Sequence, residues 1–400
     1  MSSPAPAAVK ISDLHAAPVV ERLITPAFAL IVAMQLAFGF GFSIFFLLPK
    51  YLTTSLHAGP DAVGWVSASA VVAAVLAVPL LGRAIDHYDR RYLIVAGALG
   101  SALCALCFTL VQSVGLALLL LRAVQGVSMA LVFNAAATLV TDLAPPARMG
   151  QALGLFGLSA LITNAVAPAI AESVAVRSGW SAVFVMSAAS ATLCASLALF
   201  LPRPVRSHAH AHAGRPSYGP RVLKILYAIG IVGLAFGTLF TFSLPFALSL
   251  GAREVSNFFI GYTLTAATLR ILLGSWADRV GRPRVAVGAL AVYCTALFAA
   301  CGLQPQWLGA LGALMGAGHG LAYPALNAMV VEGVPVQHRG RVMSLFNGCF
   351  NAGVALSTLT LGAVAKEFGY PLVFAIAGVV ALSGLPLLVQ VARSEPAHVE

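Results

Sequence analysis

The stretch Gly82-Arg-Ala-Ile-Asp86-His-Tyr-Asp-Arg90-Arg91 returns, 192 residues later, as Gly274-Ser-Trp-Ala-Asp278-Arg279-Val-Gly281-Arg282-Pro-Arg284. Each copy follows one long apolar run and precedes another. Self-similarity over so long a period is the signature of a chain built from related structural units. The sequence therefore predicts two related halves, joined somewhere between the two copies.

The composition predicts that these halves lie in a membrane. Hydrophobic residues make up 60% of the 400 residues and charged residues only 9%, against about 25% charged in a soluble domain. A net charge of +10 could indicate nucleic-acid binding, but the Lys and Arg residues lie in short loops between apolar runs. Nucleic-acid binding is excluded because no soluble basic domain is present.

The apolar runs are long enough for membrane-spanning helices, which need about 20 residues to cross roughly 30 Å of hydrocarbon. The first run is too long for the apolar region of a secretory signal, so we expect it to remain as a span. Twelve spans are predicted, at 26–49, 61–81, 92–113, 115–140, 150–172, 180–201, 223–249, 256–275, 284–303, 307–331, 341–363 and 370–391.

The distribution of Lys and Arg predicts the orientation. With the N-terminus in the cytoplasm, 17 of the 23 Lys and Arg residues fall in cytoplasmic segments and 4 fall outside, while Arg122 and Arg270 lie within spans. We therefore expect both termini in the cytoplasm of a multi-pass protein of the inner (plasma) membrane.

A second repeated pattern supports the duplication. Gly126, Asp142 and Pro145 correspond to Gly316, Glu332 and Pro335 at a spacing of 190 residues. The predicted division is a cytoplasmic N-terminal tail (1–25), a first six-helix half (26–201), a linker (202–222), a second six-helix half (223–391) and a cytoplasmic C-terminal tail (392–400). Alternating histidines at 208–212 lie in the linker, without an acidic or Cys partner, so we expect no metal site.

These motifs resemble those of the major facilitator superfamily over residues 26–391. The family signature Gly-x-x-x-Asp-Arg-x-Gly-Arg-Arg is matched by Gly82, Asp86, Arg90 and Arg91, with His87 and Asp89 as departures. The second copy matches at Gly274, Asp278, Arg279, Gly281 and Arg282.

The resemblance implies an all-α integral membrane protein, with twelve transmembrane helices in two pseudo-symmetric six-helix halves. It also implies that Asp86 and Asp278 face helix starts in the opposite half and hold the cytoplasmic side shut; the alternative is that the charges only set topology.

Two candidates for proton coupling lie in the first half. Arg122, Gln125 and Gly126 resemble the family's Arg-x-x-Gln-Gly motif, in which the Arg is implicated in proton coupling; the alternative is an Arg that reaches to the outer interface. Glu172 ends the fifth predicted span. A carboxyl group near hydrocarbon can bind and release a proton near neutral pH, although pairing with Arg177 at the outer surface is the alternative.

A third candidate is His319, in the middle of the tenth span. His319, Tyr323 and Asn327 recur at every fourth residue and therefore share one helix face, and a packed structural His is the alternative. We expect a mostly aromatic, weakly polar central cavity. Its further candidates are Gln35, Phe38, Gln125, Asn134, Asn164, Phe240 and Asn347.

The first hypothesis for function is proton-coupled efflux of a small amphipathic organic compound (a drug, a sugar-like molecule or a secondary metabolite) by alternating access. It rests on the Arg122 motif, on the Phe-rich helices and on a span that resembles a degraded antiporter motif around Pro168. The resemblance is closest to the drug/proton antiporter and sugar-efflux-like branches. The alternative is proton-linked uptake of a sugar or organic acid. Few cations lie within the spans, which argues against a strongly anionic substrate.

Other classes of function lack support in the sequence. It shows no nucleophile–base pair, metal-ligand cluster or phosphate loop, so we expect neither an enzyme nor a cofactor. The expected partners are a small-molecule substrate, protons and the lipid bilayer, and we expect a monomer because one chain contains both halves.

Overall fold

The computed structural model describes residues 24–145, 148–201, 218–332, 334–335 and 338–394, and all regular structure in these ranges is helical. The predicted N-terminal tail, most of the linker with its histidines, and the last six residues lie outside the described residues. The helices before the linker are α1 (Pro26–Ser43), η2 (Ile44–Leu47), α2 (Leu48–Ser55), α3 (Pro60–His87), α4 (Arg90–Phe108), α5 (Leu116–Leu143) and α6 (Met149–Leu199). After it come α7 (Pro220–Ser249), α8 (Ser256–Val280), α9 (Arg282–Cys301), η4 (Pro305–Trp307), α10 (Leu308–Glu332), α11 (Arg339–Phe368), α12 (Tyr370–Leu382) and α13 (Gly384–Arg393).

These helices account for the twelve predicted spans. Nine helical segments in the described part of the chain are long and apolar enough to cross a membrane, and α8 and α10 have 25 residues each. α6 contains the fifth and sixth spans as two helical arms, separated at Gly179, where φ is +78° and the backbone is not helical. The first span continues through η2 and α2 to Ser55. The bend at Gly179 also changes one expectation, because Glu172 lies inside the first arm of α6 rather than at its end.

Within each half, glycines allow the backbones of neighbouring helices to approach closely. A Cβ at Gly126 of α5 would lie 2.7 Å from Ala70 Cα of α3. A Cβ at Gly316 of α10 would lie 3.0 Å from Tyr262 Cα of α8. Gly126 and Gly316 are equivalent in the sequence repeat, so the duplication preserves a helix–helix contact as well as a motif.

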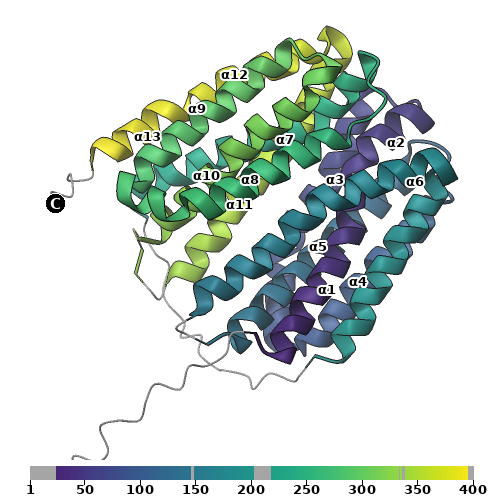
Figure 1. The fold of residues 1–400 in the computed structure, drawn as a ribbon, viewed down its shortest axis with the longest axis horizontal. Coiled ribbons are helices and arrows are strands. Elements are labelled where there is room, and N and C mark those ends of the chain that lie inside the picture. The colour runs from purple at the N-terminus through teal and green to yellow at the C-terminus, as the bar shows by residue number, and fades with distance from the viewer. Residues whose placement is uncertain (1–23, 146–147, 202–217, 333, 336–337, 395–400) are drawn as a thin grey trace, which may run out of the picture.

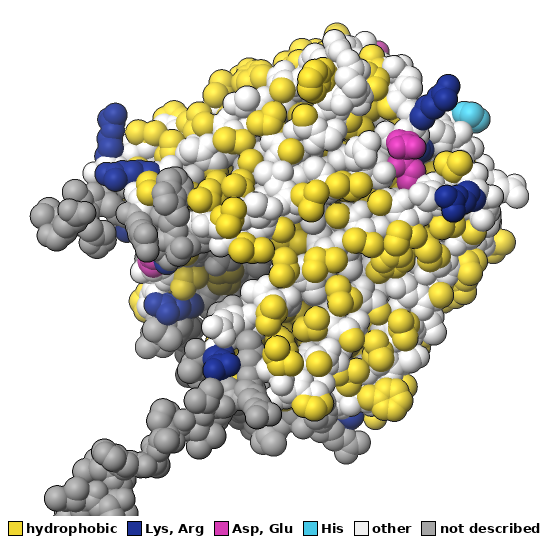
Figure 2. Space-filling view, in the orientation of Figure 1, with side chains coloured by type: hydrophobic (Ala, Val, Ile, Leu, Met, Phe, Trp, Pro, Cys, Tyr) yellow, Lys and Arg dark blue, Asp and Glu magenta, His cyan; other side chains and the backbone are white. Residues whose placement is uncertain are grey.

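Figure 1 shows the helices before the linker side by side in one bundle and those after it in a second bundle. We call the end of the molecule with the α3–α4 and α8–α9 junctions the motif side. The end with the α2–α3, α7–α8 and α11–α12 junctions is the opposite side. Between these ends, hydrophobic side chains are spread over the surface, and Lys and Arg gather at the ends themselves (Figure 2). This surface is that of a multi-pass membrane protein.

Candidate functional site

Glu172 joins the two halves on the opposite side. Its carboxylate in α6 binds the Lys50 ammonium of α2, and both side chains are buried, 11% exposed for Lys50 and 5% for Glu172. The same carboxylate accepts hydrogen bonds from the backbone N–H groups of Val255 (2.9 Å) and Ser256 (2.8 Å), where α8 begins. Lys50 Nζ also donates to the Arg253 carbonyl oxygen at 2.8 Å. Lys50 and Glu172 of the first half therefore hold the α7–α8 connection of the second half, and we call this group the Glu172 latch.

The chemistry of the latch explains why a carboxylate stands at this position. The first N–H groups of a helix have no partner within the helix, and the helix dipole adds partial positive charge there. Glu172 satisfies two of these groups and neutralises the buried charge of Lys50. Each partner would be costly to bury alone, so the latch is stable only while all its members are together.

The seam between α3 and α11 closes the same side. Gly64 of α3 lies against the Thr358 carbonyl oxygen, and a Cβ at Gly362 of α11 would lie 3.0 Å from the Pro60 carbonyl oxygen. Asp61 and Lys366 form an ion pair across this seam at 2.9 Å, with Lys366 55% exposed. Together with the latch, the seam leaves the two halves in direct contact on the opposite side.

We expect Asp61→Asn to change the transport rate by less than about twofold. An exposed ion pair contributes about 0–1 kcal/mol, and the glycine contacts of the seam do not depend on it. The measurement is the initial transport rate in proteoliposomes, with Lys366→Met as the matched variant. A tenfold loss in either variant would show that the ion pair, and not the glycine contacts, holds the seam.

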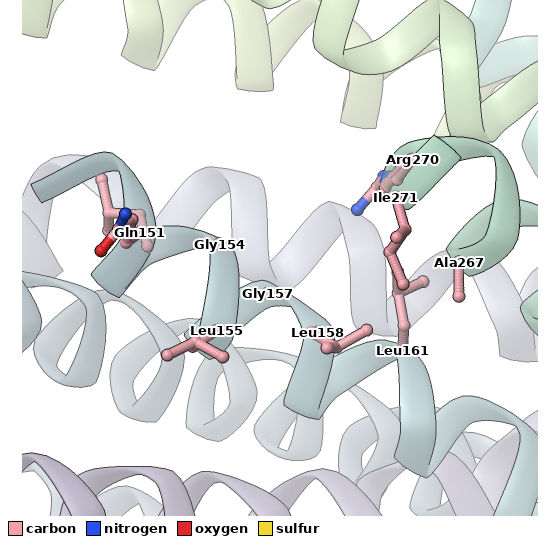
Figure 3. Close-up of a pocket in the computed structure, with 10 residues that line it drawn as sticks. Gln151, Gly154, Leu155, Gly157, Leu158, Leu161, Ala267, Arg270 and Ile271 are labelled. Carbon is pink, nitrogen blue, oxygen red and sulfur yellow. The ribbon is translucent and has the colours of Figure 1, made fainter. Parts of the chain in front are cut away.

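On the motif side the halves enclose a cavity of about 540 Å³ between α6 and α8. Gly154, Gly157 and Leu158 of α6 line one wall, and Ala267 and Arg270 of α8 line the other. A Cβ at Gly154 or Gly157 would meet no atom within 4 Å. Figure 3 shows the open space between these helices. The conformation is therefore closed on the opposite side and hollow between the halves on the motif side.

A continuous series of aromatic rings crosses from one half to the other. Phe46 of η2 packs edge-on against Phe240 of α7, with ring centroids 5.1 Å apart. Phe240 stacks on Phe236 at 4.4 Å, and Phe236 lies 5.1 Å from His319 of α10. Tyr323 continues the series, 5.5 Å from His319. We call these five residues the aromatic wall.

His319 is held by its neighbours in this wall. Its side chain is 8% exposed, and Tyr293 OH lies 3.0 Å from Nδ1. Tyr323 donates a hydrogen bond to Asn347 Oδ1 at 2.6 Å. The predicted face of His319 and Tyr323 is thus brought together with two other candidates, Asn347 and Phe240, in the second half. Asn327, also on α10, is half-buried.

The predicted cavity residues of the first half are placed differently. Gln35, Phe38 and Gln125 are buried, at 2%, 3% and 0% exposed. Asn164 accepts a hydrogen bond from Ser43 between α6 and α1 at 2.9 Å. Asn134 is exposed and donates to the Ala130 carbonyl of its own helix. The hydrogen bonds of Asn164, Gln125 and Asn134 are made within the first half.

Arg122 is buried within the first half and does not reach an interface. It is 8% exposed, donates from Nη1 to Gln125 Oε1, and lies over the Phe45 ring at 5.7 Å. Its Nε–H group has no hydrogen-bond partner in the described structure. The motif thus forms a local Arg122–Gln125 pair, held against an aromatic ring by a cation–π contact.

The repeated motif makes equivalent ion pairs in the two halves. Arg90 pairs with Asp142 at the end of α5, and Arg282 pairs with Glu332 at the end of α10. Asp142 and Glu332 are the acids of the second sequence repeat. Arg91 pairs with Asp89 at 2.8 Å, and Gly82 is exposed. The side chains of Asp86, Asp278 and Arg279, and Gly274, lie outside what the structure describes, so their gating role stays a prediction.

Two functional candidates were missed from the sequence. Lys50 was counted as an outer-loop charge, although a lone Lys between Phe45 and Leu52 in an apolar run is a signal for a buried partner. Arg270 was recognised only as a cation within a predicted span. Its Nε–H group is buried without a partner among the described residues, and its side chain lines the α6–α8 cavity.

Comparison with known proteins decides the family. The family model described as Major Facilitator Superfamily matches residues 29–253 and 225–400. The chain belongs to this superfamily. A Major Facilitator Superfamily chain is a membrane transporter rather than an enzyme, and this one has the all-α fold of two pseudo-symmetric six-helix halves.

Curated relatives and solved structures agree with this assignment. The chain is 28% identical over 327 residues to multidrug resistance protein MdtG of Citrobacter koseri, covering 78% of this chain and 80% of the relative. It is 26% identical over 355 residues to MdtG of Enterobacter lignolyticus, covering 84% of each. The fold matches the nucleoside transporter NupG with a TM-score of 0.76 at 14% identity, over 91% of this chain and 99% of that one. It also matches a bacterial homologue of the human lysosomal transporter Spinster, in an inward-facing and unoccupied conformation. That match has a TM-score of 0.71 at 15% identity and covers 92% and 98% of the two chains.

Proposed function

We propose that this transporter exports small amphipathic organic compounds across the plasma membrane, driven by inward proton flow. The main observation behind this proposal is the aromatic wall, which joins the two halves. The protein is closed on the opposite side and has a cavity between the halves on the motif side. Such a surface can bind apolar molecules without strict shape requirements. The MdtG relatives support export, since their name describes resistance to many drugs.

Transport would proceed by alternating access, with the halves rocking about the site. The motif side is proposed to face the cytoplasm, because the Lys and Arg bias predicts it. In the described conformation the Glu172 latch is closed, and substrate would enter from the motif side. A C-terminal fluorescent-protein fusion that fails to fluoresce, while an alkaline phosphatase fusion is active, would contradict this orientation. A monomer is proposed, and light scattering of the purified chain measures it.

The test of export compares cells that lack the protein with cells that overexpress it. Small molecules are quantified inside the cells and in the medium by mass spectrometry. Export predicts compounds that are retained by the deletion strain and enriched in the medium of the overexpressor. Compounds depleted from the medium only when the protein is present would establish the alternative, proton-linked uptake of a sugar or organic acid.

Protons are proposed to act at the Glu172 latch, with His319 and Arg122 as the other candidates. Protonation of Glu172 would remove the charge that Lys50 and the α8 N–H groups bind. The latch would then open, so protonation of Glu172 would favour the conformation that is open on the opposite side. A proton bound between the halves would bias which side is open.

We expect His319→Gln to reduce proton-coupled transport if His319 carries the proton, because glutamine keeps polarity but cannot be protonated near neutral pH. Transport by His319→Gln is measured against external pH, with Tyr293→Phe as control because it removes the hydrogen bond at Nδ1 but leaves the imidazole. An unchanged pH profile in His319→Gln would exclude His319 and leave the latch and Arg122 as candidates.

A further inference from the structure

Arg270 is the only charged residue among those that line the α6–α8 cavity. Figure 3 shows its guanidinium extending from α8 into the space that faces the α6 glycines. The buried Nε–H group has no hydrogen-bond partner, and no described carboxylate lies within ion-pair distance of the side chain. An unpaired Arg within a membrane protein is costly, and such residues mark substrate or ion pathways.

The guanidinium has donors suited to one kind of ligand. It is planar, always charged and presents up to five N–H groups in a fixed fork. A carboxylate or sulfonate matches this fork with two parallel hydrogen bonds. A neutral or cationic group would leave the charge of Arg270 unbalanced.

The rest of the cavity is suited to an apolar body. Leu155, Leu158 and Leu161 of α6 form an aliphatic wall, and Gly154 and Gly157 leave free space beside it. A volume of about 540 Å³ is within the usual range for small-molecule sites, roughly 300–1,000 Å³.

We propose that Arg270 binds the acidic group of amphipathic organic anions, whose apolar part packs against the α6 leucines. The proposal rests on the proposed function and narrows its substrates to compounds with one acidic group. It agrees with the scarcity of cations within the spans, because one Arg balances one negative charge. Compounds with several charges are excluded.

The test measures equilibrium binding to the full-length chain in nanodiscs of phosphatidylcholine. The probes are 2-naphthalenesulfonate and the neutral 2-naphthalenesulfonamide, which share the same ring system and differ in charge. We expect the sulfonate to bind at least about tenfold more tightly, which corresponds to about 1.4 kcal/mol. Arg270→Gln should abolish this preference and Arg270→Lys should keep part of it. Arg177→Gln, which removes an exposed cation at the far end of the first arm of α6, should leave it unchanged.

Three results would overturn the proposal. They are equal or absent binding of the two probes by the unmodified chain, a preference that persists in Arg270→Gln, and displacement of the sulfonate by phosphatidylglycerol added to the nanodiscs. The last result would make the cavity a lipid headgroup site. The proposed function can fail independently of this site. If the chain binds the sulfonate through Arg270 but does not alter the cellular retention of any compound, the anion site stands and the export proposal is wrong.

Discussion

Glu172→Gln is expected to abolish most of the pH dependence of transport and to shift the protein toward a conformation open on the opposite side. Glutamine keeps the shape of the side chain, but it leaves the buried Lys50 ammonium without a counter-charge. Breaking one side of a buried ion pair costs about 3–5 kcal/mol, enough to change a conformational equilibrium by at least about a hundredfold. The measurement is the initial rate in proteoliposomes against external pH.

The conformational part of this prediction has its own measurement. Spin labels at Arg177 of α6 and Glu367 of α11, in a cysteine-free background, report the separation of the halves on the opposite side. Glu172→Gln should lengthen this distance. Glu254→Gln is the matched control, since Glu254 is an exposed acid next to the latch. Unchanged pH dependence and distance in Glu172→Gln would show that the seam alone closes this side.

The double variant Lys50→Met/Glu172→Gln separates loss of the ion pair from loss of the charge. Removing both charges eliminates the buried unpaired ammonium, and replacing a complete buried pair is often neutral for stability. We expect the double variant to recover closure of the opposite side while remaining insensitive to pH. Additive effects of the two single changes would mean that Lys50 and Glu172 act independently.

The fold could be predicted because its determinants are local or periodic in the sequence. Span length, the spacing of the Gly–Asp motifs and the second repeat indicated twelve helices in two halves. The division between the fifth and sixth spans was also predicted, because the non-helical backbone at Gly179 separates the two arms of α6 between residues 172 and 180. The extension of the first span to Ser55 was missed because Pro49 and Lys50 resemble a loop.

The site could be predicted only in part, because its contacts join residues far apart in the chain. Glu172 was found as an acid in an apolar span, but the sequence offered the nearby Arg177 as its partner. The structure instead brings Lys50 from 122 residues away and the start of α8 from 83 residues away. The stripe of His319 and Tyr323 was predicted, since helical period determines which residues share a face. That Arg270 has no ion-pair partner among the described residues could not be predicted, because it depends on the separation of α6 from α8.

Gly312→Ala is expected to destabilise the folded protein far more than the same substitution at an exposed glycine within a helix. Gly312 of α10 lies directly against the backbone of α8, and a Cβ there would lie 2.8 Å from the Phe258 carbonyl carbon and closer still to its oxygen. The obstacle is backbone, so no side chain can rotate away and α8 must move from α10. Overpacking of this kind costs about 1–3 kcal/mol or more, and Gly316, against Tyr262 one turn later, should behave alike.

The measurement is the thermal unfolding temperature of the purified protein in detergent. The matched control is Gly288→Ala in α9, where an added Cβ meets no atom within 4 Å and helix propensity favours Ala by about 1 kcal/mol. Equal unfolding temperatures for Gly312→Ala and Gly288→Ala would mean that the contact between α8 and α10 adjusts without cost, and that glycine spacing does not determine how these halves are built.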